Sequence, residues 1–374
     1  MPAQDSQDYD PLYKIKPVID HFAHVFKRHF HPSQNIAIDE STVGFRGRTP
    51  HLRQYMPQKR HARFGVKLWC LCDTETGYTH AFEVYMGVRQ EDSSGEGFTY
   101  NLVMCLMRQA DLLYQGYHLG LDNYFTSPQL FQDLYNMKTT ATGTVRKSRK
   151  GLPKNCVNAS LANQKVCERR KRPLLCVAFK DGINQPIFLS TISKGGYSDY
   201  TNSRGKVETK PNVIDYNKCK GGVDLKDSKL YKYLAERRTV KWTTKVAFAL
   251  FGTAVLNSYI LYIKHTSSQN RMPRKHYMLS IIEALVEDYR PKRPSHKRRS
   301  NAEIAASREA RIEPPSHEIA VPEDVHELHK LPKSKLRMCV AGHERRVRST
   351  WECQKCDVGL CAACFASYHK KKTE

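Results

Sequence analysis

The sequence is poor in acidic residues and contains no long uninterrupted hydrophobic run. Asp and Glu number 37 against 61 Lys and Arg, which gives a formal net charge of +24 at pH 7. The polar segment 1–10 gives no indication of a secretory signal. The longest apolar stretch, Val246–Ile263, is interrupted by Gly252, Thr253, Asn257 and Ser258. Such interruptions favour a buried helix over a membrane span, so we expect no contact with a membrane.

The twelve cysteines are not distributed as in a disulfide-rich protein. Five of them fall within the last 36 residues at the spacing of metal ligands, and the others are scattered through apolar segments. This usage favours a reducing compartment. The surplus of positive charge predicts a polyanionic partner, of which nucleic acid is the usual one. The alternative is a diffusely basic surface that binds any anion weakly.

The stretch Tyr216–Asp227 combines a Gly-Gly break with two acids and the start of an apolar helical pattern. A helix beginning near Val223 would place Asp224 and Asp227 one turn apart at its N-terminus. The helix dipole stabilises negative charge at that position, which suits the binding of a cation. The alternative is an ordinary acidic first turn.

Two further aspartates come at the ends of predicted strands. The buried strand Phe64–Asp73 ends in Asp73, and the short strand 116–122 ends in Asp122. Strand ends and helix starts are where an α/β sheet gathers its chemistry. Three carboxylates brought together there would repel one another unless they share a proton or a metal. Acids without His or Cys alongside suit Mg²⁺ or Mn²⁺ better than zinc.

Six short segments follow one another along almost the whole chain: Ile38–Ser41, Phe45–Arg48, Gln54–Pro57, Leu121–Ser127, Gly143–Arg146 and Lys220–Asp224. In this order they resemble the piggyBac transposase family, in particular its domesticated, transposable-element-derived members. The resemblance implies an α/β fold with a ribonuclease-H-like core, in which a mixed sheet is flanked by helices and carries an inserted β-rich subdomain.

The resemblance also implies a catalytic Asp-Asp-Asp triad, which we map onto Asp73, Asp122 and Asp224, with Asp227 as a nearby fourth acid. Two Mg²⁺ ions bound by this triad would catalyse phosphodiester hydrolysis and strand transfer on double-stranded DNA. We interpret Asp39 and Glu40 as structural partners of nearby arginines, because we do not expect the family's catalysis to depend on them.

The family's transposases carry a long segment ahead of the core, whereas here the resemblance begins almost at residue 1. We therefore keep three alternatives open: an active transposase, a domesticated and catalytically inactive DNA- or chromatin-binding protein, and a truncated transposase copy. The resemblance also raises the expectation of a homodimer.

Composition and motifs predict five segments. They are the first part of the core at 1–152, the inserted subdomain at 153–215, the rest of the core at 216–288, a basic and Pro-rich linker at 289–328 and a cysteine-rich zinc-binding domain at 329–374.

Basic residues gather beside the acid-bearing segments. Such cations contact phosphates, and a Trp among them can stack on an unpaired base. The alternatives are solvated charge for any single cation and, for Trp242, an anchor for the helix that follows. The DNA-binding candidates are Lys59, Arg60, Arg63, Arg146, Lys147, Arg149, Lys150, Arg237, Arg238, Lys241 and Trp242.

A second basic run opens the predicted linker, and we interpret it as a nuclear localisation signal. A loose DNA clamp and a solvated charge run are the alternatives. The residues concerned are Arg290, Lys292, Arg293, Lys297, Arg298 and Arg299.

Two close cysteine pairs near the C-terminus predict structural zinc. The candidate ligands are Cys339, His343, Cys353, Cys356, Cys361, Cys364 and His369, with His329 as an eighth. The spacing does not decide which of them share an ion. The resemblance implies a cross-brace RING- or PHD-like domain with two zinc ions, which contributes to recognition of transposon ends. Binding of chromatin proteins is the alternative role.

Overall fold

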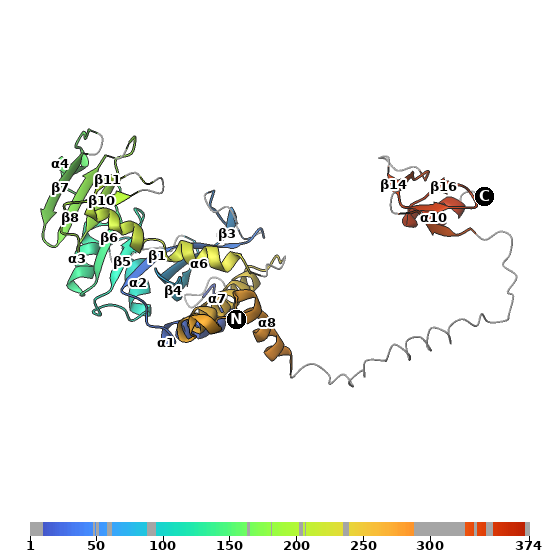
Figure 1. Ribbon diagram of the computed structural model, residues 1–374, viewed down its shortest axis with the longest axis horizontal. Helices are drawn as coiled ribbons and strands as arrows, with labels where there is room; N and C mark the ends of the chain where they lie inside the picture. The colour runs from blue at the N-terminus through green and yellow to red at the C-terminus, as the bar shows by residue number, and fades with distance from the viewer. Residues whose placement is uncertain are drawn as a thin grey trace. The chain divides into compact units, whose positions relative to one another are not determined.

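The computed structural model describes most of the chain in two units. The described residues are 10–47, 49, 52–57, 62–87, 95–162, 165–180, 182–201, 205, 207–234, 239–287, 326–332, 335–341 and 347–370. The chain divides into Met1–Tyr289 and Arg290–Glu374, and each unit is considered by itself (Figure 1). Most of the predicted linker and the whole nuclear localisation signal lie outside the described residues.

A mixed β-sheet forms the centre of the first unit. Its strands are β1 (Asn35–Gly44), β2 (Gln54–Tyr55), β3 (Phe64–Asp73), β4 (Thr79–Val84), β5 (His118–Leu121), β6 (Thr140–Thr144), β7 (Val166–Lys171), β8 (Leu174–Phe179) and β9 (Ile187–Ser190). They follow the order β2-β3-β1-β5-β6-β9-β8-β7, and β4 pairs with β3. β1 pairs with β5, and β5 with β6, in parallel, whereas β1 pairs with β3 in antiparallel register.

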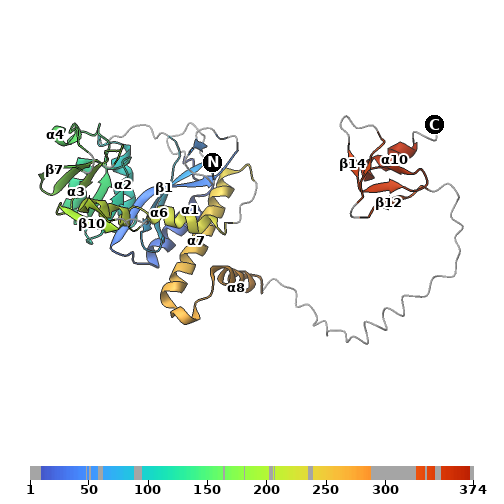
Figure 2. The same cartoon turned by 45° about the horizontal axis from the view of Figure 1, so that its top comes forward.

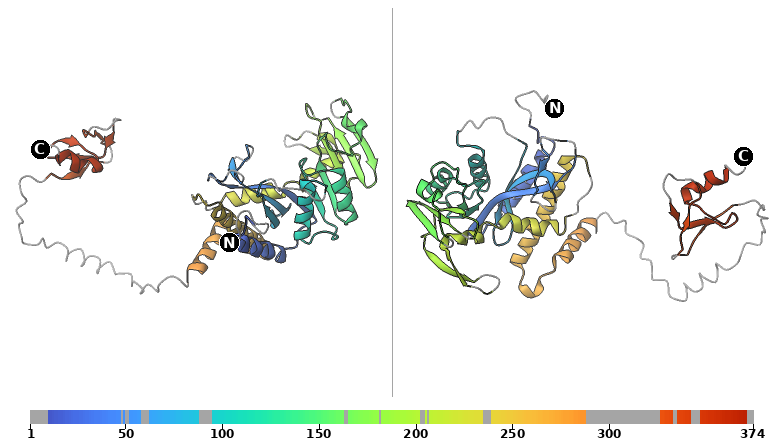
Figure 3. Two further views of the ribbon diagram at one scale, coloured as in Figure 1. Left: turned by 180° about the vertical axis from the view of Figure 1, so that it is seen from behind. Right: turned by 90° about the horizontal axis from the view of Figure 1, so that it is seen from above.

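Helices cover both faces of this sheet. On one face, α1 (Lys16–Arg28), α6 (Gly222–Tyr231) and α7 (Trp242–His265) pack on residues such as Leu68 and Cys70. On the other, α2 (Phe98–Gln109) and α3 (Pro128–Asn136) pack on Ile36, Ile38 and Leu71. In the right-hand view of Figure 3, the blue strands lie between the teal helices and the orange α7. The alternation of apolar side chains along β1 and β3 therefore serves two apolar layers.

Local sequence explains several element boundaries. Ser127 is the N-cap of α3, where its hydroxyl accepts the N–H of Leu130 at 3.2 Å, and Pro128 occupies the first helical position. The apolar stretch 246–263, predicted to be a buried helix, lies within α7, and α8 (Arg274–Glu287) follows after a turn (Figure 2). The shorter elements are α4 (Lys154–Val157), α5 (Tyr216–Cys219), β10 (Tyr197–Thr201), β11 (Val207–Pro211) and the 3-10 helices Asn212–Asp215 and Ser268–Asn270.

The predicted insertion at 153–215 is rich in strands but does not form a separate sheet throughout. β9 pairs with core strand β6, and β8 and β7 follow outward, so these three strands extend the central sheet. Only β10 and β11 form a hairpin of their own. The physical reason is that β6 would otherwise leave an unpaired edge, which β9 covers.

Helix α7 is, within the described residues, the one helix that is long and apolar enough to cross a membrane by length and composition. One of its polar interruptions, Asn257, forms hydrogen bonds with another part of the unit. Asn257 accepts the backbone N–H of Thr79 at 3.0 Å and donates to the Thr79 carbonyl at 2.9 Å. Val246 and Leu250 lie in the apolar layer with α1. These contacts are those of a core helix.

The second unit is small and built from short strands. β12 (Leu328–Lys330), β15 (Trp351–Cys353) and β16 (Val358–Gly359) form one sheet, and β13 (Arg337–Met338) pairs with β14 (Arg348–Ser349). The helix α10 (Ala362–Lys370) ends the described part. Few described residues of this unit are buried, among them Cys353 and Leu360.

Two buried histidines predict that the first unit loses stability in mild acid. Burial lowers the pKa of His80 and that of His118 to about 4 from about 6.5. The unfolded chain then binds protons more readily, so stability that is present above pH 6.5 is lost as the pH falls towards 4. Each histidine should cost about 2 kcal/mol between pH 7 and pH 5, measured by urea unfolding.

His118→Gln tests this directly, because the His118 Nδ1 lies 2.9 Å from the Thr140 hydroxyl and a carboxamide can keep a hydrogen bond there. The variant should show a smaller loss of stability between the two pH values. His29→Gln, at an exposed position, is the control. An unchanged pH dependence in His118→Gln would contradict the assignment.

Candidate active site and metal centres

Two aspartates lie side by side on the central parallel strands. Asp39 is in β1, and Asp122 directly follows β5. The parallel register pairs Ile38 with Leu121, so Asp39 and Asp122 occupy the next step on neighbouring strands. Because side chains alternate along a strand, both leave the sheet on the face opposite Ile38 and Leu121. That face carries α6.

Electrostatics around Asp122 favour a nearby positive charge. Its Oδ1 accepts the backbone N–H of Tyr124 at 2.8 Å. Burial raises the pKa of the Asp122 carboxyl, and Glu40 raises it further, while the Tyr124 N–H and Arg146 act in the opposite direction. Burial also raises the pKa of Tyr216, and the negative charges of Asp122 and Asp39 raise it further. The Tyr216 hydroxyl is thus close enough to feel both acids.

Helix α6 brings Asp224 towards the same place. Figure 1 shows α6, in yellow, beside β1. The Tyr231 hydroxyl donates to the Thr42 carbonyl of β1, and Asp224, two turns earlier, lies on the same flank of the helix. Asp227 accepts the Ser41 hydroxyl at 2.6 Å. Asp224 precedes Asp227 by three residues, a rise of about 4.5 Å, which corresponds to between one and two strand residues from Ser41 towards Asp39.

A glycine makes the approach to this face possible. The chain entering α6 passes so close to β5 that a Cβ on Gly120 would lie 2.3 Å from the Cys219 carbonyl oxygen. A side chain at this position would clash with the Cys219 carbonyl. Because glycine has none, α5 and the start of α6 can lie directly on the sheet. Asp39, Asp122 and the exposed Asp224 are consequently brought to one face by β1, β5 and α6.

The mapping of the first catalytic acid onto Asp73 does not fit this arrangement. Asp73 pairs with Ile36, whereas Asp122 is level with Asp39. The two acids are therefore separated by about 10 Å along the strands and about 10 Å across them. The Asp73 carboxylate is fully buried and accepts hydrogen bonds from the backbone and hydroxyl groups of Ser33 and Thr76. It is held as a structural cap of the β3–β4 turn.

Asp39, for which the sequence predicted a structural role, has a position that the sequence did not indicate. The Glu40 carboxylate, predicted to have a structural role, lies 3.9 Å from the Lys67 ammonium. Asp39 instead shares the face of Asp122. One feature of the sequence could have identified it: a carboxylate inside an otherwise buried central strand, Ile36–Val43, is costly unless it has a function.

Asp227, predicted as a fourth catalytic acid, is buried and forms an ion pair and a hydrogen bond. Its side chain is 8% exposed, and the Lys226 ammonium lies 3.1 Å away. The Ser41 hydroxyl donates to the same carboxylate oxygen. Asp227 thus lies near the three acids, but it is paired with a buried cation.

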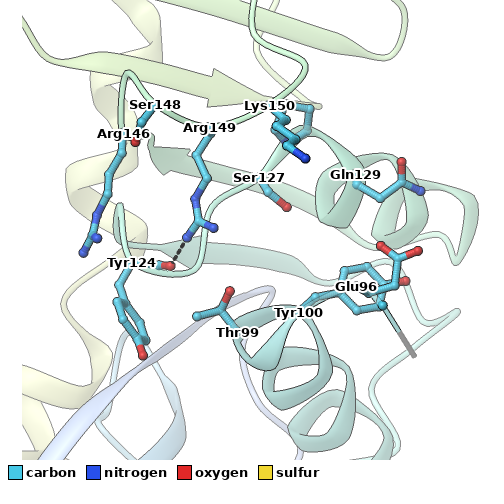
Figure 4. A pocket seen from close by; sticks show the side chains of 12 residues that line it. Glu96, Thr99, Tyr100, Tyr124, Ser127, Gln129, Arg146, Ser148, Arg149 and Lys150 are labelled. Carbon is cyan, nitrogen blue, oxygen red and sulfur yellow. Dashed lines mark hydrogen bonds between the residues drawn. The ribbon is translucent and has the colours of Figure 1, made fainter. Parts of the chain in front are cut away.

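Three of the predicted cations, Arg146, Arg149 and Lys150, line a cavity of about 630 Å³ that also includes Tyr124 (Figure 4). Arg146 donates to the Asn123 side chain at 3.2 Å, and its guanidinium lies 5.6 Å from the centre of the Tyr124 ring. Arg149 donates to the Tyr124 carbonyl. Lys150 and the N-terminal residues of α3, Ser127–Gln129, complete this side of the cavity, while Glu96 and Tyr100 lie opposite. The cavity combines cations with an aromatic ring, a chemistry suited to nucleotides.

The other DNA-binding candidates are spread more widely. Lys147 is exposed in the same loop, and Arg63 and Lys241 are exposed elsewhere on the unit. Trp242 is half-buried and packs on the α1–α7 layer, as expected of a helix anchor. Lys59, Arg60, Arg237 and Arg238 lie outside the described residues.

The second unit brings its Cys and His residues into two groups. His326, Cys353, Cys356 and His369 form one, and Cys339, Cys361 and Cys364 the other, with donor atoms within 4.8 Å of one another in each. The groups alternate along the chain. The His369 Nδ1 lies 2.8 Å from the Phe365 carbonyl, which leaves Nε2, 3.5 Å from the Cys356 sulfur, for a metal.

His326 takes the place that was predicted for His329. The His326 Nδ1 lies 3.3 Å from the Cys356 sulfur and 3.5 Å from the Cys353 sulfur. His329 lies in β12, opposite Glu352, and its imidazole is 3.5 Å from the Glu327 carboxylate. The pairing of β12 with β15 therefore directs it away from the sulfurs. His343 lies outside the described residues. Groups of Cys and His residues such as these could hold metal ions.

Comparison with known proteins identifies a matching family model and similar proteins. The family model described as Transposase IS4 matches residues 1–259. PiggyBac transposable element-derived protein 3 of Homo sapiens is 26% identical over 388 aligned positions, covering 98% of this chain and 60% of that protein. PiggyBac transposable element-derived protein 2 of Homo sapiens is 23% identical over 273 positions, covering 68% and 44%. The chain thus spans only part of the length of these relatives.

The fold is shared with a solved structure, a piggyBac transposase synaptic complex with hairpin DNA. The TM-score is 0.65 at 24% sequence identity, and the match covers 95% of this chain and 74% of that chain. A match of this extent shows a common mixed α/β fold with a central mixed sheet.

Proposed function

The chain belongs to the piggyBac-type transposase family, and from this membership we propose that its first unit cuts and rejoins DNA strands. Asp39, Asp122 and Asp224 are the catalytic acids in this proposal. The observation that carries it is the meeting of β1, β5 and α6, which brings all three acids to one face of the sheet. The core is then ribonuclease-H-like, and the second unit a cross-brace domain of RING or PHD type.

The three carboxylates fit a pair of divalent cations. Oxygen donors without His or Cys suit Mg²⁺ or Mn²⁺, and a half-buried Asp122 with a raised pKa gains from a nearby positive charge. When bound, such ions stabilise the attacking and leaving oxygens of an in-line displacement at phosphorus. Water would attack first to nick the strand, and the freed 3′-hydroxyl would attack a second phosphodiester.

The protein's own groups position the substrate. The Tyr124 N–H fixes the Asp122 carboxylate, and the same loop orients Arg146 and Arg149 through Asn123 and the Tyr124 carbonyl. These arginines would hold phosphates of the strand being cut, within reach of the acids. The alternating Cys/His groups of the second unit would hold two structural zinc ions, and that unit would add DNA or chromatin contacts. Nuclear import through Arg290–Arg299 and action as a homodimer belong to the same proposal.

The alternative is a domesticated protein that binds DNA or chromatin without cutting it. The basic cavity beside Tyr124 and the Cys/His groups favour it, because neither depends on cleavage. A truncated transposase copy is a further possibility, in which the acids remain through ancestry.

Strand cleavage with Asp122→Asn tests the proposal. The wild-type protein should nick a DNA duplex in Mg²⁺, and the variant should be at least about a hundredfold slower, because a carboxamide is a poor ligand for a hard cation. Asp20→Asn, in an exposed pair with Lys16, is the matched control. Equal cleavage by the wild type and Asp122→Asn excludes catalysis by these acids, and absence of cleavage in the wild type favours the binding protein.

The cations of the loop after β6 should affect DNA affinity rather than sequence preference. Replacing Arg146, Lys147 and Lys150 together by Gln should weaken duplex binding severalfold at low salt and reduce the salt slope of log K by about one for each lost phosphate contact. Fluorescence anisotropy at several salt concentrations measures both. Lys218→Gln, exposed on α5, is the control, and an unchanged slope in the triple variant would place the DNA elsewhere.

A further inference from the structure

Lys226 is a cation of α6 whose side chain points into the protein and is buried, which is rare for a lysine. Its side chain is 2% exposed. The ammonium donates to the Ser41 hydroxyl at 2.7 Å and lies 3.1 Å from the Asp227 carboxylate. Ser41 in turn donates to the same Asp227 oxygen at 2.6 Å. These three side chains form a closed triangle, which we call the Lys226–Ser41–Asp227 triangle.

The triangle joins β1 and α6, two of the three elements that carry the proposed catalytic acids. Ser41 follows Asp39 by two residues in β1, on the same face of the sheet. Lys226 follows Asp224 by two residues in α6. A Cβ at Gly77, which has a φ of +75°, would lie 3.0 Å from the Lys226 backbone nitrogen, so the helix is also seated closely on the β3–β4 turn. A shift of α6 along β1 would separate Lys226 and Asp227 from Ser41.

We propose that Lys226 is a positioning residue, which fixes Asp224 relative to Asp39 by forming a buried ion pair with Asp227. Asp227 is then the counter-ion of Lys226 and not a ligand of the catalytic cations. The inference rests on the proposed function, because it assigns the acids that the triangle aligns. Asp39, Asp122 and Asp224 are then the cation-binding acids, and the charge of the fourth acid is balanced within the fold by Lys226.

The positioning role depends on the balance of two buried charges, those of Lys226 and Asp227. A buried ammonium and carboxylate stabilise each other only as a pair, and the loss of one partner leaves the other buried and uncompensated. Lys226→Met would leave the Asp227 charge beside Ser41, and Asp227→Asn would leave the ammonium. The double variant Lys226→Met with Asp227→Asn removes both charges, while the carboxamide can still accept the Ser41 hydroxyl. A thioether stem of similar length fills the space of the lysine.

A double-mutant cycle on the full chain tests the proposal. We would measure the midpoint of thermal unfolding, cleavage of a DNA duplex in Mg²⁺, and binding of Mn²⁺ by calorimetry. Each single variant should unfold at a lower temperature and cleave at least about tenfold more slowly. The double variant should recover cleavage to within about threefold of the wild type and bind Mn²⁺ within about threefold of the wild-type affinity. Lys218→Met, which breaks the exposed pair with Asp215, should change nothing.

Two results would overturn the proposal. A double variant that binds Mn²⁺ at least tenfold more weakly than the wild type, while unfolding at a similar temperature, would identify Asp227 as a ligand. A Lys226→Met variant that cleaves as fast as the wild type would show that the triangle does not align the acids.

Failure of the proposed function gives a different pattern. If the wild type does not cleave DNA and Asp39→Asn binds Mn²⁺ as the wild type does, the acids are not a cation site. The unfolding part of the cycle still reports then whether Lys226 and Asp227 are energetically coupled.

Discussion

Asp39→Asn should reduce Mg²⁺-dependent strand cleavage by about a thousandfold or more, since the cation centre supplies several kcal/mol of transition-state stabilisation. Asp73→Asn should retain cleavage in the fraction of molecules that is folded. The reason is register: Asp39 is level with Asp122 on the neighbouring strand, whereas Asp73 is paired with Ile36. Gel-resolved nicking of a labelled duplex, normalised to folded protein, measures both.

Substitutions of two other acids, Glu40 and Asp73, serve as controls for this experiment. Glu40→Gln changes the next residue along β1, whose carboxylate is paired with Lys67, and should cleave within a few-fold of the wild type. Asp73→Asn should lower the unfolding temperature, because Asp73 accepts hydrogen bonds from both Ser33 and Thr76. A folded Asp73→Asn protein without activity, together with an active Asp39→Asn protein, would return the first acid to Asp73.

Removal of zinc should unfold the second unit and leave the first unit folded. Few described residues of the second unit are buried, so burial of apolar surface contributes little to its stability. Structural zinc contributes on the order of 10 kcal/mol or more to folding in small metal-binding domains. A chelator should abolish amide protection in 326–370 and leave the central sheet protected. Hydrogen exchange with mass spectrometry resolves the two regions.

Zinc content per chain distinguishes the ligands. The intact protein should hold two zinc ions, and His326→Ala should retain about one, because His326 contacts both Cys353 and Cys356. His329→Ala is the matched control and should keep two, since its imidazole lies beside Glu327. Retention of two ions by His326→Ala and loss of one by His329→Ala would reverse the assignment. A second unit that stays folded in chelator would remove the structural role of the metal.

Local sequence was sufficient for features that depend on neighbouring residues. The strand end at Asp122, the N-cap at Ser127 and the helix start before Asp224 follow from the order of apolar, polar and Gly residues. The family could be identified from short ordered segments, and the close cysteine pairs indicated metal groups. In each case the information lies within a few residues of the position concerned.

The proposal of Asp39 as the first acid depends on the pairing of strands. A period of two shows which side chains of a strand share a face, but not which strands become neighbours or in what register. Asp73 and Asp39 both belong to apolar strands, and only the register of β1 with β5 brings Asp39 beside Asp122. For the same reason, the sequence could not show that β7–β9 extend the core sheet. They do so because β9 pairs with the edge of β6 that would otherwise be unpaired.

By itself, therefore, the sequence determined the family, the basic character and most local elements of this protein. The tertiary structure decided which acids meet, that His326 replaces His329, and that Lys226 neutralises Asp227. These outcomes depend on contacts between residues far apart in the chain, such as Ser41 with Asp227. Their free energy comes from the burial and pairing of polar groups in three dimensions, and no local pattern of residues encodes it.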